Sequence, residues 1–292
     1  MPVQPRPGAT VPRQRHRRSA RAPLVLLLAL PALLFLVLPI LTIVPMSFTA
    51  GHVVEFPPSA WGLTAYRELF ADDGWRQAIV FSLKVSAMSV VLSVVAATLA
   101  AIGLPRLQTR GEGLIAAVIL VPLAMPVVVL ALGTFQFFIQ IQLNATLVGI
   151  AIAHAVVGVP YVFLTVRAAL SKLDIALVRS AMSLGAGTWS VLRWVYLPAI
   201  LPALLSGALL VFVVSFDEVV VALFLSGPGS ITFPVKLFTE VQFNLSPAIL
   251  AVSTLLLAAV IVAVAAGIGL FGARRTVYRV AFGEKAEADH GG

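Results

Sequence analysis

Two adjacent carboxylates, Asp217 and Glu218, interrupt an apolar run that reads VVSFDEVVVALFL. An acid at the centre of a membrane span costs about 2.5–3.5 kcal/mol on insertion scales, so a pair facing lipid is disfavoured. We expect both side chains to face a bundle interior, water or a partner chain. Three roles remain open: an ion pair or helix cap, with Lys84 as the ion-pair partner; a gate or contact between subunits; and attraction of a cationic substrate.

The composition predicts an integral membrane protein. Of 292 residues, 60% are hydrophobic and only 11% are charged, whereas soluble domains have nearer half and about a quarter. The absence of cysteine excludes disulfides, cysteine-ligated zinc and iron–sulfur clusters. The chain contains no G-x-x-x-x-G-K-[ST], H-E-x-x-H or G-x-S-x-G motif. We therefore predict no catalytic residue, no metal site and no cofactor on this chain.

Six stretches are long and apolar enough to cross a bilayer, which takes about 20 residues each. The predicted fold is all-α, with a six-span domain over 24–272 between a disordered basic tail (1–23) and a second tail (273–292). The last apolar run but one has 28 residues, more than a straight crossing needs, so we expect it to be tilted or broken. The six stretches are 24–48, 77–104, 113–134, 146–168, 199–226 and 248–272.

The net charge of +8 is concentrated beside the apolar stretches. Six arginines precede the first stretch and three follow the last. Basic excess also alternates along the loops, since the 49–76 loop is net acidic and the 169–198 loop is net basic. Basic residues beside spans mark the cytoplasmic side. The pattern therefore predicts a multi-pass protein of a bilayer with both termini in the cytoplasm, and argues against nucleic-acid binding.

The loop LDIALVRSAMSLGAGTWSVLRWVYLP, residues 173–198, is predicted to form two short cytoplasmic helices. Asp174 can cap the first helix, and Gly185 suits the left-handed residue that ends it. Thr188 can cap the second, which we expect Leu197-Pro198 to break before the next span begins.

This loop resembles the cytoplasmic motif of ABC-importer permeases. That motif has Glu-Ala-Ala, three residues, Gly, nine residues and Ile-x-Leu-Pro; here Ser180-Ala181, Gly185, Val195 and Leu197-Pro198 keep the same spacing. The resemblance implies the type I importer permease fold and a loop that docks on a cytoplasmic ATPase. This chain has Arg179 at the motif's glutamate position. The docking residues implied are Arg179, Ser180, Ala181, Gly185, Leu197 and Pro198.

A second segment, SFDEVVVALFLSGPGSITFPVKLF (215–238), is similar to its counterpart in permeases of the spermidine/putrescine importers. The similarity implies a subunit of an ATP-driven importer of the bacterial inner membrane. It implies three kinds of partner: a second permease, a dimer of ATPases that hydrolyses the ATP, and a periplasmic binding protein. On this interpretation Asp217 and Glu218 line the path of a polyamine, and Asp217→Asn and Glu218→Gln are expected to impair uptake.

Two other functions remain open. An ABC permease for iron, a phosphonate or an opine-like amine has the same loop. An ion-coupled secondary transporter could instead use Lys84, His154, Asp217 and Glu218 as a proton or cation relay. Against such a relay, a lone histidine in a span more often bonds to a neighbouring helix, and we expect this of His154.

Overall fold

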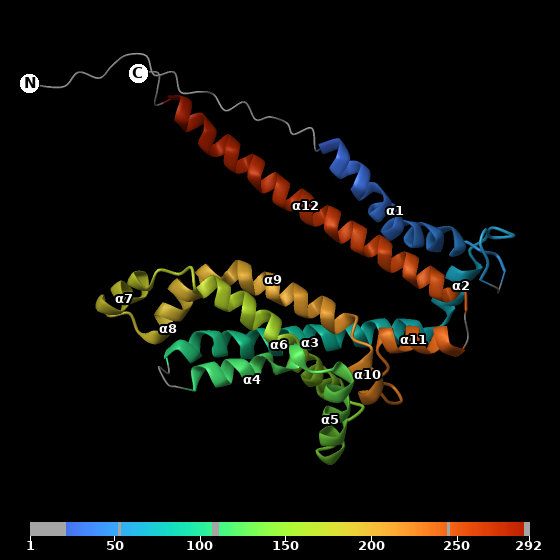
Figure 1. The fold of residues 1–292 in the computed structure, drawn as a ribbon, viewed down its shortest axis with the longest axis horizontal. Coiled ribbons are helices and arrows are strands. Elements are labelled where there is room, and N and C mark those ends of the chain that lie inside the picture. Colours follow the sequence, from blue (N-terminus) through green and yellow to red (C-terminus); the bar gives the residue numbers. More distant parts are fainter. Residues whose placement is uncertain (1–21, 52–53, 107–110, 244–245, 289–292) are drawn as a thin grey trace, which may run out of the picture.

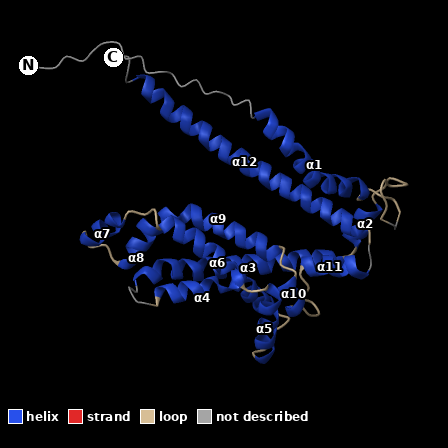
Figure 2. Ribbon diagram, in the orientation of Figure 1, coloured by secondary structure: helices blue, strands red, loops and turns tan. Residues whose placement is uncertain are grey.

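The computed structural model describes residues 22–51, 54–106, 111–243 and 246–288. These residues are almost wholly helical, apart from loops and one antiparallel bridge between Thr49 and Trp61 (Figure 2). The predicted tail 1–23 lies outside the described residues except at its last two positions. The helices are α1 (Ala22–Met46), α2 (Thr64–Ala71), α3 (Asp73–Gly103), α4 (Glu112–Ala124), α5 (Val127–Gln140), α6 (Leu147–Leu170), α7 (Ile175–Ser183), α8 (Thr188–Val191), α9 (Leu197–Phe216), α10 (Val220–Leu225), α11 (Phe233–Phe243) and α12 (Ala248–Ala288).

The helices match the predicted spans with one correction. Five of the described helices are long and apolar enough to cross a membrane, and α4 with α5 gives a sixth if the pair counts as one span. This pair was predicted as one continuous stretch, 113–134, but it bends by 106°. Met125, at φ −84° and ψ 136°, ends α4. Because Pro126 follows it, Met125 is disfavoured in the helical region, which explains the break.

The core of the molecule consists of α3, α6 and α9, which lie side by side (Figure 1). Glycines allow the close approach of these helices. A Cβ on Gly158 of α6 would lie 2.8 Å from a methyl of Val211, and one on Gly207 of α9 would lie 3.1 Å from the Cα of Val162. Small residues at helix crossings are typical of membrane bundles, where close van der Waals packing holds helices together.

Serine hydroxyls add polar contacts between α3 and α6. Ser89 Oγ donates to the carbonyl of Ala151 at 2.9 Å, and Ser93 Oγ donates to that of Ala155 at 3.2 Å. All four residues belong to the buried face between the two helices. The donors are four residues apart on α3 and the acceptors are four residues apart on α6. The two bonds therefore fix the relative register of α3 and α6.

Helices α1 and α12 diverge from this core (Figure 1). They contact each other, and α12 also packs on α2 and α11. Their apolar side chains are widely exposed, with 80% of Phe35 on α1 and 70% of Ile268 on α12 accessible. Helix α12 runs from Ala248 to Ala288, so it extends past the last predicted span into the second predicted tail (273–292). The segment is rich in Ala, Arg and Glu, which favour helix.

One end of the bundle carries α2 and α11 and is called the α11 end. At this end Lys236 of α11 links its own helix to the start of α3. Its ammonium group lies 3.3 Å from the carboxylate of Asp72 and 2.7 Å from that of Glu240. Burial lowers the pKa of Lys236, but hydrogen bonds and charge attraction from these two acids outweigh that effect and leave the pKa above its ordinary value. The opposite end of the bundle carries α7 and α8, and is called the α7–α8 end.

Candidate functional site

The acidic pair lies in a break between two helices. Helix α9 ends at Phe216 and α10 begins at Val220, so the expected break in this span is confirmed. The carboxylate of Glu218 accepts a hydrogen bond from the backbone N–H of Val221 at 3.0 Å. This contact satisfies one of the free N–H groups at the start of α10. Glu218 therefore acts as a helix cap, one of the roles left open by the sequence.

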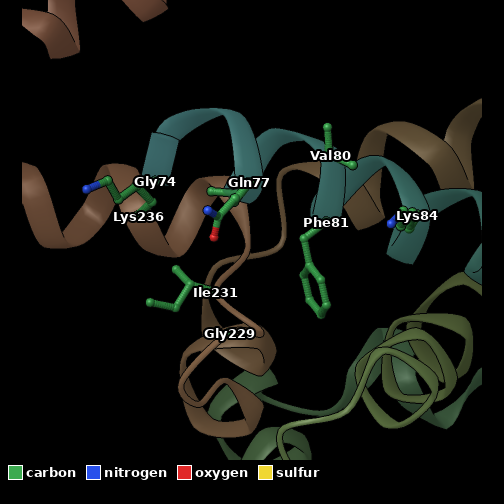
Figure 3. Close-up of a pocket in the computed structure, with 9 residues that line it drawn as sticks. Gly74, Gln77, Val80, Phe81, Lys84, Gly229, Ile231 and Lys236 are labelled. Carbon is green, nitrogen blue, oxygen red and sulfur yellow. The ribbon is translucent and has the colours of Figure 1, made fainter. Parts of the chain in front are cut away.

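Asp217 differs from Glu218. Its side chain is exposed, and its carboxylate has no hydrogen-bond or ion-pair partner within the described part of the chain. The ion pair with Lys84, one of the alternatives that the sequence left open, is not formed among the described residues. Lys84 is also exposed and lines a separate cavity of about 320 Å³ near the α11 end, with Gln77, Phe81 and Lys236 (Figure 3).

The register of the helices explains why Lys84 and Asp217 do not meet. Ser215, two residues before Asp217, contacts His154 of α6, and Ser89 of α3 bonds to Ala151 of α6. Asp217 is thus near the level of Ser89 on α3. Lys84 precedes Ser89 by five residues, or about 7.5 Å of helix toward the α11 end.

Asp217 and Glu218 both line a cavity of about 410 Å³. It opens where the two broken spans meet, between the α4–α5 bend and the α9–α10 break, and α6 forms a third wall. Discontinuous helices near the bilayer centre commonly form the substrate sites of transporters. The residues that line the cavity include Met125, Val157, Tyr161, Val214, Asp217 and Glu218.

Tyr161 is the one cavity residue with a polar group that the sequence analysis did not single out. It comes from α6, directly after Pro160, and is half-buried. A tyrosine within an otherwise apolar span was the available signal. Its place in the cavity, however, depends on which face of α6 the broken spans cover, and that is a tertiary property.

The second halves of the two broken spans pack on each other. Helix α10 lies against α5, and the rings of Phe135 and Phe224 meet edge-on with centroids 6.4 Å apart. The segments that follow the two breaks are therefore packed together.

His154 holds the end of α9 against α6. The side chain is buried, and its Nδ1 lies 2.9 Å from the hydroxyl of Ser215. The expected bond to a neighbouring helix is confirmed. Because Ser215 lies in the last turn of α9, this contact fixes the position from which Asp217 and Glu218 project.

The loop 173–198 contains the two predicted short helices. The carboxylate of Asp174 accepts from the backbone N–H of Ala176 at 2.8 Å, so the predicted cap of α7 is confirmed. Gly185 has φ +87°, and the N–H of Ala186 bonds back to the carbonyl of Ala181 at 3.0 Å. This is the left-handed glycine turn expected at the end of α7.

Two details of the loop need correction. Thr188 is the first residue of α8 rather than its cap; Gly187 has the cap position and makes no side-chain bond. Leu197-Pro198 does not interrupt the helical course of the chain. A π-helical turn, Leu192–Tyr196, joins α8 to α9, and the N–H of Leu197 bonds to the carbonyl of Leu192. The wider turn shifts the bonding register just before Pro198, which lacks an N–H of its own.

The loop presents apolar side chains outward at the α7–α8 end. Leu184 is 89% exposed, and Trp189 and Trp194 are 70% and 72% exposed. Arg179 and Ser180, in the position of the family motif, are exposed as well. Buried Val178 and Val191 lie beneath this surface, where α7 and α8 contact each other. A compact helical pair with such a surface is suited to contact a partner protein.

Comparison with known proteins identifies the family. The family described as "Binding-protein-dependent transport system inner membrane component" matches residues 89–277, which include the cavity and the loop. The chain belongs to this family. It is therefore a transport component of the inner membrane and not an enzyme, as predicted, and membership decides against the ion-coupled secondary transporter.

Several relatives of this permease are named as permease proteins of transport systems. The putrescine transport system permease protein PotI of Escherichia coli K12 is 33% identical over 247 residues, which cover 82% of this chain and 88% of the relative. The spermidine/putrescine permease PotC of Haemophilus influenzae is 29% identical, covering 76% and 86%. A putative 2-aminoethylphosphonate permease, PhnV of Salmonella typhimurium, is 27% identical, covering 71% and 78%.

A solved structure shares the fold of the permease. A bacterial ABC transporter involved in the import of the acidic polysaccharide alginate aligns with a TM-score of 0.68 at 20% identity, covering 83% of this chain and 94% of the other. The predicted all-α importer permease fold is confirmed.

Proposed function

We propose that the permease imports polyamines and that Asp217 and Glu218 line the path of the substrate. The observation that carries this proposal is the unpaired Asp217 carboxylate in the cavity between two broken spans. Polyamines are linear molecules with two or more ammonium groups, which a carboxylate attracts. The names of the putrescine and spermidine relatives support the same substrate class.

A permease for another small solute is the second candidate, because one relative is named for 2-aminoethylphosphonate. Iron and opine-like amines belong to the same group of alternatives. 2-Aminoethylphosphonate carries an ammonium group that the acids would attract, but also a phosphonate group whose negative charge Asp217 and Glu218 would repel at short range. The acidic cavity therefore favours a cation over a phosphonate.

We infer further that two copies of a cytoplasmic ATPase bind and hydrolyse the ATP and dock on α7 and α8. The exposed apolar surface around Leu184 supports this inference. Under this proposal both termini lie in the cytoplasm, and 24–272 is the membrane domain between the tails 1–23 and 273–292. The proposed docking residues are Arg179, Ser180, Ala181, Gly185, Leu197 and Pro198.

The remaining partners complete a transport cycle. A periplasmic binding protein would deliver the substrate at the α11 end, and a second permease would form the other wall of the path. Closure of the ATPase dimer would move α7 and α8, and the continuous helix from α8 through the π-helical turn into α9 would carry this motion to Asp217. The path would then open alternately to the two sides of the membrane.

Uptake of labelled putrescine tests the proposal. Cells without polyamine importers of their own would express the permease with the other subunits of its system. Asp217→Asn should reduce kcat/KM about 10- to 100-fold, the expected effect of losing a charge-assisted contact. Asp73→Asn is the matched control, since Asp73 is exposed and paired with Arg76 at 2.8 Å.

Two results would contradict the proposal. Unchanged uptake by Asp217→Asn, at equal membrane levels, would remove Asp217 from the path. Wild-type uptake of 2-aminoethylphosphonate without uptake of putrescine would overturn the substrate class.

A further inference from the structure

The two acids of the cavity are not equivalent. Glu218 is half-buried, and its carboxylate already accepts the N–H of Val221. Asp217 is exposed in the same cavity and has no partner within the described residues. Asp217 therefore offers a carboxylate with both oxygens open to a cation, whereas one oxygen of Glu218 is already committed to Val221.

Tyr161 offers a second group that can bind a cation. It lines the same cavity, and within the described part of the chain its hydroxyl makes no hydrogen bond. An aromatic face attracts ammonium groups through its quadrupole, and it does so more strongly where water is excluded.

The two groups lie at different levels of the cavity. His154 contacts Ser215, so it marks the level of the last turn of α9. Tyr161 follows His154 by seven residues, about 10 Å of helix toward the α7–α8 end. Side chains on a helix lean toward its N-terminus, so the ring of Tyr161 leans toward the level of Asp217.

The wall between these two groups is apolar, with Val157 on α6, Val214 on α9 and Met125 at the α4–α5 bend. The cavity thus presents a carboxylate, then an apolar stretch, then an aromatic ring. A diamine has the matching order of ammonium, methylene groups and ammonium.

We propose that Asp217 binds one ammonium group of a linear diamine while the ring of Tyr161 binds the other. This inference rests on the proposed function, because it concerns recognition of the same substrate in the same cavity. It assigns to Tyr161 the discrimination between a diamine and an amine with a single positive charge.

The test compares Tyr161→Phe with Tyr161→Leu in the complete importer, using putrescine as the substrate and n-butylamine as a competitor with one charge. Tyr161→Phe keeps the ring and should leave the KM for putrescine within 2-fold of wild type. Tyr161→Leu should raise it about 5- to 30-fold, the range for a partly desolvated cation–π contact. The inhibition constant of n-butylamine should stay within 2-fold in both variants, because its one ammonium group would bind Asp217.

The outcomes separate the two proposals. Wild-type importer that takes up no putrescine overturns the proposed function. Wild-type uptake of putrescine together with a KM change below 2-fold in Tyr161→Leu overturns the role of the ring and leaves the proposed function intact. An equal loss of affinity for putrescine and n-butylamine would show general damage to the cavity and would also overturn the role of the ring. If Tyr161→Leu does not co-purify with the ATPase, Tyr161→Met, whose longer unbranched side chain reaches further into the cavity, replaces it.

Discussion

The carboxylate of Glu218 reaches three residues along the chain to the N–H of Val221, so a charged side chain closes one end of a helix break. A contact of this kind depends on an acceptor atom rather than on the full charge. Glutamine keeps an acceptor oxygen at the same distance from the backbone, whereas alanine has none.

We therefore expect Glu218→Ala to destabilise the permease and Glu218→Gln to do so much less. Loss of a helix cap costs about 0.5–2 kcal/mol, which corresponds to a fall of about 1–3 °C in the apparent Tm of a chain of this size. Thermal unfolding of the purified permease measures this difference. The sequence alone predicted that Glu218→Gln would impair uptake; the cap geometry predicts less impairment than in Asp217→Asn.

Equal falls in Tm for the two Glu218 variants would show that the cap contact does not stabilise α10. Asp73→Asn again serves as the charge-loss control, because Asp73 is exposed and far along the chain from α10. Its Tm should fall less than that of Glu218→Ala, since exposed ion pairs contribute about 0–1 kcal/mol and many contribute nothing measurable.

Among the elements, the α7–α8 pair depends on one backbone conformation. Gly185 has φ +87°, and a Cβ added there would meet no atom within 4 Å. A substitution at this position therefore acts through backbone strain and not through a clash, at a cost of about 1–2 kcal/mol for a non-glycine residue. Gly187 also has open space around it, but its φ is −71°, which other residues adopt freely.

Gly185→Val should therefore reorient α7 and α8 and reduce recovery of the ATPase at least several-fold in a pull-down of the tagged permease in mild detergent. Gly187→Val should recover the ATPase as wild type does. Gly185→Asn should be intermediate, since asparagine tolerates the left-handed region. Full recovery with Gly185→Val would mean that the glycine turn does not shape the docking surface.

Sequence reasoning predicted the elements better than their contacts. The caps and the turn of α7 depend on neighbouring residues, so Asp174 and Gly185 were found from local pattern. The break at Asp217 followed from the length of the span. The break after Met125 was missed because the apolar run continues through it, although Pro126 was visible in the sequence. The Lys84 pairing failed because counting from the ends of two spans does not give their relative register.

At the scale of the whole molecule, the described core helices and the pair α1–α12 leave many apolar side chains exposed. On α9, Leu205 and Leu209 are each 64% exposed. On α12, Val262 is 66% exposed. Hydropathy could predict that these residues lie within the bilayer, but not whether lipid or protein covers them, because both environments are apolar.

We expect the second permease to cover the exposed face of α9, since α9 leads to the cavity and its outward leucines are exposed on this chain. The chain contains no cysteine, so a single cysteine at Leu209→Cys can carry a photoactivated cross-linker without background from this subunit. Illumination of the assembled importer should capture the second permease. The matched control is Ser190→Cys on exposed α8, which should capture the ATPase instead. Cross-links from Leu209→Cys to lipid alone would show that the face of α9 is an outer surface of the assembly, and the second wall of the path would have to lie elsewhere.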